Sequence, residues 1–271
     1  NLYSMFNKHP KGLIAAALAN LGERFGFYTM MAILVLFLQA KFGMNGKEAG
    51  FIYSTFYFSI YILALVGGII ADKTRNYKGT IFTGIVLMAV GYLLLAIPSK
   101  TPVDNKMLYL VITCASLFVI AFGNGLFKGN LQALVGQMYD NPQYANMRDS
   151  GFSLFYMFIN IGAIFAPFAA VGVRNWWLST FGYNYDADLP ALCHGQLAGT
   201  LSPEATETYH TLVTKASTAP VQDYTAFASD YLNVFTTGFH YAFGVAIIAM
   251  AISLTIYWLN KKNFPDPKIG R

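Results

Sequence analysis

The chain has 271 residues, of which 55% are hydrophobic and 11% are charged. Because soluble domains carry about 25% charged residues, this composition excludes an ordinary soluble globular protein. The formal net charge of +5 comes from Lys and Arg distributed near the ends of apolar segments, so it does not indicate a nucleic-acid-binding protein.

Six long apolar segments follow one another along the chain. A membrane-spanning helix needs about 20 mostly apolar residues, whereas a barrel strand needs only ~10 and alternates with period two, which these segments do not. We therefore expect an all-α membrane protein with six transmembrane helices, at residues 12–40, 50–71, 79–97, 107–137, 149–171 and 237–260.

These segments predict three parts of the chain. Residues 1–171 hold helices one to five, 172–236 form a long polar loop, and 237–271 hold helix six and the start of a cytoplasmic linker. Lys and Arg are more frequent in the loops on the side of the two termini, which predicts a multi-pass plasma (inner) membrane protein with a cytoplasmic N-terminus. The loop would then be extracytoplasmic, either as a small cap or as a mobile segment.

The first segment carries two charged residues at membrane depth, Glu23 and Arg24. A charge there is costly, so it indicates a functional site more often than packing. On a helix these two share one face with Phe27 and Tyr28. Adjacent residues point about 100° apart, so we expect Glu23 and Arg24 to bond poorly to each other and to need partners elsewhere. An internal Glu–Arg pair that holds the bundle together is the alternative.

The second segment carries three tyrosines one turn apart, Tyr53, Tyr57 and Tyr61. They line a cavity if they face the same space as Arg24, and otherwise they pack as an aromatic stripe.

A turn with one acid and several cations follows the second segment. Its predicted role is a structural or gating latch between two helices, without contact to substrate. The residues concerned are Gly68, Asp72, Lys73, Arg75 and Lys78.

The fourth segment places Lys128 among glycines at membrane depth. A lone buried ammonium loses its proton or finds an anion, and Glu23 is the expected anion. A buried Lys–Glu pair makes the protonation of each group depend on the other, which proton coupling requires. Snorkelling of Lys128 to the interface is the alternative.

The fifth segment has a polar stripe of Ser153, Tyr156 and Asn160. Asn160 would hydrogen-bond either a substrate amide or a neighbouring helix. The two cysteines are not expected to form a disulfide. No spacing of His, Asp or Cys predicts a metal site, a cofactor site or an enzyme active site.

Several of these stretches resemble the motifs of one family, the proton-coupled oligopeptide transporters of the major facilitator superfamily. Asn20 to Tyr28 resembles E-x-x-E-R-F-x-Y-Y, and Phe122 to Asn130 resembles F-G-N-G-x-F-K-P-N. Asp149 to Pro167 resembles the long D-S-G-F signature, and Gly68 to Lys78 resembles the superfamily loop G-x-x-x-D-R-x-x-G-R-R-K. The resemblance implies the N-terminal six-helix half of this fold, built from two inverted three-helix repeats.

The resemblance also implies a function and residue roles. The function is proton-coupled symport of di- and tripeptides by alternating access, with peptide, protons, the lipid bilayer and a second six-helix half as partners. Glu23, Arg24 and Lys128 would carry proton coupling. The residues that would contact the peptide are Arg24, Phe27, Tyr28, Tyr61, Lys128 and Asn160.

Three departures from the family pattern keep other functions open. Asn20 stands where the motif has its first glutamate, Met31 stands where an arginine often follows, and Phe27 replaces a tyrosine. The second six helices are also missing from this sequence, so this chain alone is not expected to transport. The alternatives are transport of nitrate or another small anion by the same fold, and a non-transporting peptide sensor.

Overall fold

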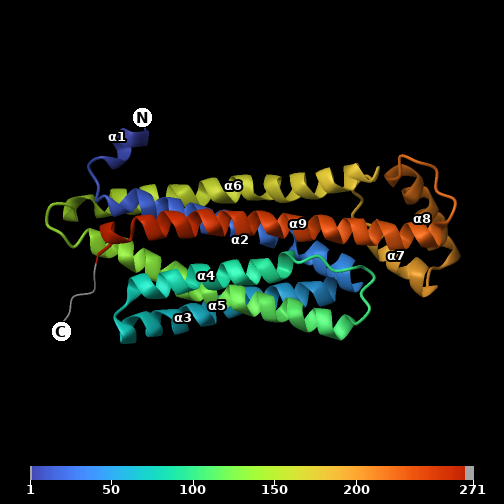
Figure 1. The fold of residues 1–271 in the computed structure, drawn as a ribbon, viewed down its shortest axis with the longest axis horizontal. Helices are drawn as coiled ribbons and strands as arrows, with labels where there is room; N and C mark the ends of the chain where they lie inside the picture. Colours follow the sequence, from blue (N-terminus) through green and yellow to red (C-terminus); the bar gives the residue numbers. More distant parts are fainter. Residues whose placement is uncertain (1, 266–271) are drawn as a thin grey trace.

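The structure is a computed structural model, and it describes residues 2–265. Six helices in this range are long and apolar enough to cross a membrane, which confirms the predicted all-α membrane fold. They are α2 (Gly12–Phe42), α3 (Gly46–Thr74), α4 (Tyr77–Ala96), α5 (Lys106–Met138), α6 (Arg148–Thr180) and α9 (Tyr224–Leu259), shown in Figure 1. The shorter helices are α1 (Leu2–Phe6), α7 (Leu189–Ala198), α8 (Pro203–Ala216) and two single 3₁₀ turns at Ala145–Met147 and Lys261–Asn263.

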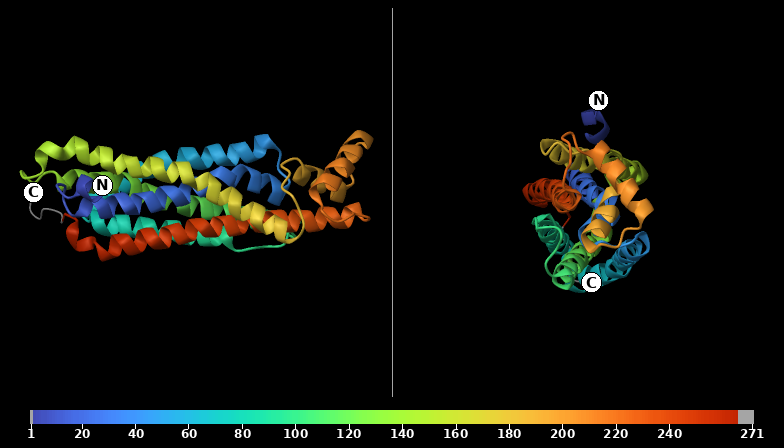
Figure 2. Two further views of the ribbon diagram at one scale, coloured as in Figure 1. Left: turned by 90° about the horizontal axis from the view of Figure 1, so that it is seen from above. Right: turned by 90° about the vertical axis from the view of Figure 1, so that its right-hand side faces the viewer.

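The long helices run side by side, and α2 contacts α3, α5, α6 and α9. Helix α5 packs against α3 and α4, and α4 packs against α9. Helix α6 packs on α2 and α9, away from the group formed by α3, α4 and α5. Helices α7 and α8 extend beyond one end of the bundle, opposite the start of α2 and the end of α9 (Figures 1 and 2).

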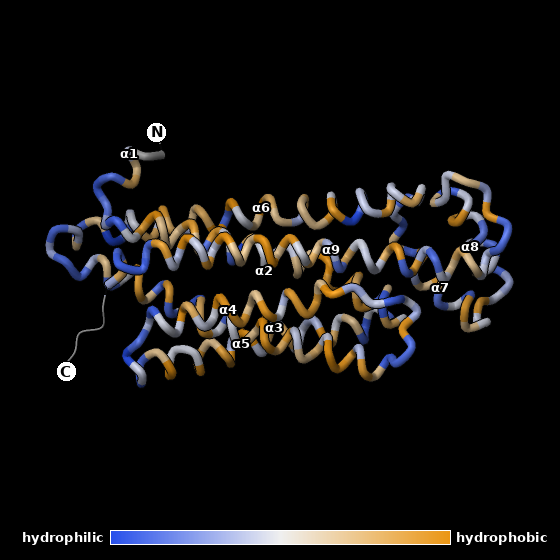
Figure 3. Tube along the Cα trace, in the orientation of Figure 1, coloured by the Kyte–Doolittle hydropathy of each residue, from blue (hydrophilic) through white to orange (hydrophobic). Residues whose placement is uncertain are grey.

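Hydrophobic residues run along the six long helices, and hydrophilic residues gather at their connections (Figure 3). The helix ends differ from the predicted ones because polar caps, and not hydropathy, set them. Asn45 Oδ1 accepts a hydrogen bond from Glu48 N at 2.8 Å, which starts α3 at Gly46. Asp223 Oδ1 accepts from the backbone of Thr225 and Ala226 at 3.1 Å, which starts α9 thirteen positions before the predicted residue 237.

The polar region between the fifth and sixth spans is a small folded cap, and it is shorter than the predicted loop of residues 172–236. Helix α6 continues to Thr180 and α9 begins at Tyr224, so both spans extend into that range. Tyr209 of α8 is fully buried and donates to the Tyr224 carbonyl at 2.6 Å. Tyr231 of α9 donates to the Asn184 carbonyl at 2.8 Å. These contacts fix the cap on α9.

Glycines bring the backbones of neighbouring spans into direct contact. A Cβ added at Gly67 of α3 would lie 2.2 Å from the Gly125 carbonyl of α5, and one at Gly84 of α4 would lie 2.6 Å from the Gly123 carbonyl. Small residues at these positions allow the close helix packing that membrane proteins rely on. They hold α5 firmly between α3 and α4, and α5 carries two of the polar side chains of the site.

Candidate functional site

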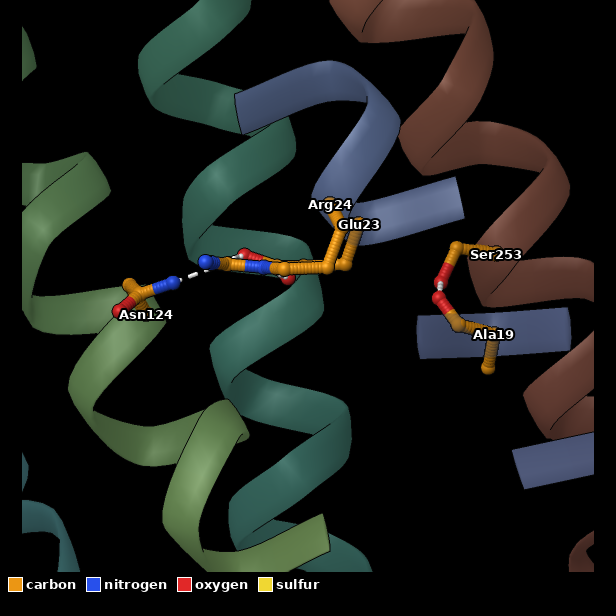
Figure 4. Close-up of polar contacts among 5 residues, drawn as sticks. All are labelled: Ala19, Glu23, Arg24, Asn124 and Ser253. Carbon is orange, nitrogen blue, oxygen red and sulfur yellow. Dashed lines mark hydrogen bonds and ion pairs between the residues drawn. The ribbon is translucent and has the colours of Figure 1, made fainter. Parts of the chain in front are cut away.

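Glu23 and Arg24 form a buried ion pair in the middle of α2. Their side chains are 0% and 4% exposed. Arg24 Nη2 donates to Glu23 Oε1 at 2.5 Å, and Arg24 Nε donates to Oε2. The prediction that these adjacent residues bond poorly to each other is wrong. The Cα–Cβ bonds diverge, but both flexible side chains turn toward α5, so the carboxylate and the guanidinium meet (Figure 4).

Asn124 of α5 is a third member of this cluster, and the sequence reasoning missed it. Its Nδ2 donates to Glu23 Oε1 at 2.7 Å, and its side chain is 1% exposed. The signal that could have found it is an amide among glycines in an apolar span, because a buried amide needs a partner. On the opposite side of α2, Ser253 of α9 donates to the Ala19 carbonyl at 2.7 Å (Figure 4). Helix α2 is thus tied to α5 and α9 by polar bonds.

Lys128 does not form the expected ion pair with Glu23. Within residues 2–265 the ion pair of Glu23 is with Arg24. Lys128 follows Asn124 by one helical turn, so both residues lie on the same face of α5. Its side chain borders a cavity instead, and it lies within electrostatic reach of Arg24, Glu23 and Tyr57.

The cavity has a volume of about 260 Å³ and is bordered by α2, α3 and α5. Five of the predicted substrate-binding residues line it, together with residues that the prediction did not assign to the site. The predicted ones are Arg24, Phe27, Tyr28, Tyr61 and Lys128, and the additional ones include Tyr57, Asn124 and Gln132. Two cations and three phenols therefore share one space.

Aromatic rings hold the Arg24 guanidinium at the edge of this cavity. Its carbon lies 4.5 Å from the ring centroid of Phe27 and 5.5 Å from that of Tyr28, within the range of cation–π attraction. On α3, Tyr61 donates to the Tyr57 hydroxyl at 3.1 Å. Of the three tyrosines that lie one turn apart on α3, Tyr57 and Tyr61 border the cavity, whereas the Tyr53 ring stacks on the Tyr57 ring.

Asn160 lies apart from this cavity. It is exposed on α6, which packs on α2 and α9 and does not border the cavity. In the described part of the chain its side chain makes no hydrogen bond, so it does not clamp a neighbouring helix. Tyr156, one turn earlier, is also exposed, at 42%.

The predicted turn joins α3 to α4 at the end of the bundle opposite the cap. Arg75 ends α3 in the left-handed conformation, with φ of 55°. Tyr77 donates to Asp72 across the turn, and Tyr257 of α9 donates to the Lys78 carbonyl at 2.8 Å. The turn is therefore bonded to both its own helix pair and to α9. Of the predicted turn residues, Gly68 lies further back in α3, and the others lie at this turn: Asp72, Lys73, Arg75 and Lys78.

The arrangement of the spans matches solved transporter structures. A crystal structure of peptide transporter POT in complex with sulfate aligns with a TM-score of 0.62 and 27% identity, over 95% of this chain and 39% of that chain. A mutant of peptide transporter POT in complex with alafosfalin aligns with a TM-score of 0.63 and 26% identity, over 95% and 40%. The arrangement of the six spans thus defines a membrane protein with the major facilitator fold.

The sequence comparisons identify the family. Residues 78–271 match the model of the POT family (PTR2). The peptide transporter YePEPT of Yersinia enterocolitica is 34% identical over 185 residues, which cover 66% of this chain and 34% of that protein. Dipeptide and tripeptide permease A of Enterobacter sp. (strain 638) is 34% identical over 179 residues, which cover 65% and 32%. The chain belongs to the POT family, and it spans about a third of the length of these relatives.

Proposed function

We propose that the polypeptide carrying this chain transports di- and tripeptides into the cell by alternating access, and that the proton gradient drives this uptake. The cavity between α2, α3 and α5 carries this proposal. It offers Arg24 and Lys128 as cationic donors, and a peptide presents one carboxylate and a polar backbone. Arginine and lysine bind carboxylates through charge-assisted hydrogen bonds.

The aromatic lining supports a substrate whose side chains vary. Tyr28, Tyr57 and Tyr61 offer hydroxyls that donate and accept, together with ring faces that accept apolar groups. Recognition of the shared backbone by such groups leaves side-chain identity unconstrained. The names of the relatives, a peptide transporter and a dipeptide and tripeptide permease, support the same class of substrate.

The buried pair supports proton coupling. Glu23 is the one carboxylate among the residues of this cluster, and it is enclosed by Arg24 and Asn124. A substrate carboxylate that binds Arg24 competes with Glu23 for the guanidinium. Protonation of Glu23 removes that competition, so proton binding and peptide binding favour each other.

Two further elements of the proposal concern the rest of the site. We assign Asn160, exposed on α6, to the wall of the central pathway, where it contacts the peptide backbone. The other wall comes from a second six-helix half, a proposal supported by relatives of which this chain covers only about a third. The chain spans the inner (plasma) membrane, with its N-terminus on the cytoplasmic side and the α7–α8 cap on the outer side.

The test is uptake by proteoliposomes that contain the polypeptide carrying this chain. We expect labelled dipeptide to accumulate when the outside is made acidic, and unlabelled dipeptides to compete. Lys128→Ala should abolish the driven uptake and leave counterflow exchange in place. Tyr257→Phe, which removes a hydroxyl far from the cavity, is the matched control and should retain both activities.

Two results would redirect the assignment. Competition by nitrate but not by dipeptides would favour transport of a small anion by this fold. Binding of peptide without any uptake would favour a sensor. Full driven uptake by Lys128→Ala would reject the coupling role of that residue.

A further inference from the structure

Two polar atoms beside the Glu23–Arg24 pair are buried without a hydrogen-bond partner in the described part of the chain. They are Asn20 Nδ2 and the Tyr92 hydroxyl, on side chains that are 3% and 0% exposed. Such groups are rare in native structures, because an unmade buried hydrogen bond is unfavourable. Two such groups near an ion pair indicate a site whose hydrogen-bond partners change between states of the protein.

Both side chains belong to the surroundings of Glu23, without a hydrogen bond to it. Asn20 precedes Glu23 by three positions on α2, so the two side chains are neighbours on one face of the helix. Tyr92 projects from α4, and its hydroxyl lies within electrostatic reach of Glu23 and Arg24. Asn124 approaches the same carboxylate from α5.

The packing of α4 on α5 fixes the position of Tyr92. A Cβ added at the adjacent Gly91 would lie 2.4 Å from Ile120 Cγ1 and 3.0 Å from the Ser116 carbonyl. Ile120 precedes Asn124 by one helical turn on α5. The α4 backbone at Tyr92 therefore cannot shift without disturbing this helix contact.

In the present arrangement Arg24 supplies two hydrogen bonds to Glu23, and Asn124 supplies a third. A carboxylate bound bidentately by Arg24 would use the same fork of donors. Glu23 would then keep the bond from Asn124 and lose the two from Arg24. It would need two replacement donors, and Asn20 Nδ2 and the Tyr92 hydroxyl are two buried donors without a partner in the described part of the chain.

We propose that Asn20 and Tyr92 are positioning residues that hold the Glu23 carboxylate while Arg24 binds the substrate carboxylate. This inference rests on the proposed peptide symport. The two residues stabilise the ionised form of Glu23 in the substrate-bound state and so help to set the pH at which it binds its proton. The other ionisable groups around the pair include Lys128 on α5, Tyr57 on α3 and Tyr28 on α2, and none of them is substituted in the comparison below.

The experiment compares Tyr92→Phe and Asn20→Leu with the unsubstituted polypeptide in proteoliposomes. Dipeptide uptake is measured against external pH, and thermal unfolding is measured in detergent. Loss of one hydrogen bond to a carboxylate should move the pH midpoint of driven uptake upward by about one unit in each variant. Thermal stability should stay the same or rise, because the removed groups have no partner in the resting protein.

Tyr257→Phe is the matched control, since its buried hydroxyl is bonded to the Lys78 carbonyl. That variant should lose stability and keep the pH midpoint. An unchanged pH midpoint in Tyr92→Phe, with uptake intact, would overturn this inference alone. A loss of stability in Tyr92→Phe as large as in the control would also overturn it, because the hydroxyl would then be bonded at rest. Absence of driven dipeptide uptake by the unsubstituted polypeptide would reject the proposed function and this inference together.

Discussion

The buried pair on α2 predicts that losing one charge is worse than losing both. Arg24→Met leaves the Glu23 carboxylate, which is 0% exposed, without its cation. Removing one partner of a buried ion pair costs about 3–5 kcal/mol of unfolding free energy. We expect a value near the lower end, about 3 kcal/mol, because Asn124 keeps its bond to the carboxylate.

The double variant Glu23→Leu with Arg24→Met should be more stable than Arg24→Met alone. No charge is left buried, and the remaining penalty is the Asn124 amide without its acceptor, about 1–3 kcal/mol. Adding Asn124→Leu removes that amide as well and should recover part of the difference. Arg24 and Asn124 both bond to Glu23, so the losses of unfolding free energy in these variants should be strongly non-additive.

Denaturant titration of the purified polypeptide in detergent micelles measures this series, and only differences between variants are used. Each variant is compared with Asn130→Leu, which removes an amide bonded to two backbone carbonyls and leaves no charge behind. The prediction is wrong if the double variant is no more stable than Arg24→Met alone. It is also wrong if Arg24→Met costs no more than the Asn130 control.

Three further predictions follow from packing and burial. Gly125→Ala should destabilise the bundle by about 1–3 kcal/mol, because its Cβ would lie 2.5 Å from a carbonyl oxygen of α3. Gly129→Ala is the control and should leave stability unchanged in the same denaturant titration, because no atom lies within 4 Å of its Cβ. His194 Nε2 donates to the Ala40 carbonyl at 2.6 Å, and burial lowers the pKa of this imidazole. The stabilising contribution of neutral His194 is therefore complete above about pH 6.5 and is lost as the pH falls below that value. Between pH 7.5 and pH 5 the melting temperature of His194→Gln should fall less than that of the unsubstituted protein. Burial raises the pKa of the Cys193 thiol to about 12, so maleimide should label it slowly at pH 8 in folded protein and rapidly after denaturation.

The six spans were predictable because the bilayer imposes length and apolarity, and both are visible in the residues. The sequence also placed Arg24, Tyr28 and Lys128 together, since charges at membrane depth must find a shared polar space. It favoured Lys128 as the partner of Glu23, and the pair with Arg24 that the structure shows was only its alternative. That choice depends on how far flexible side chains reach and on how α5 is placed against α2, and helical periodicity contains neither quantity.

The same limit explains the residues that were missed. Asn124 and Tyr92 are ordinary polar residues in apolar spans, and their importance comes from the neighbours that packing gives them. Asn160 shows the opposite case, because its motif is clear although no described residue bonds to it. Helix ends were misplaced where Asn45 or Asp223 caps a helix in a stretch that hydropathy assigns to the loop.

The length of α9 has a mechanical consequence. Its 36 residues correspond to roughly 54 Å, whereas the hydrocarbon layer is about 30 Å thick. The part of α9 that exceeds this thickness is a rigid helical extension, and the α7–α8 cap is hydrogen-bonded to it at Tyr224 (Figure 1). A small tilt of this span inside the bilayer is therefore converted into a larger displacement of the cap. A pair of spin labels, one on α8 and one on the cap-side end of α4, would measure that displacement.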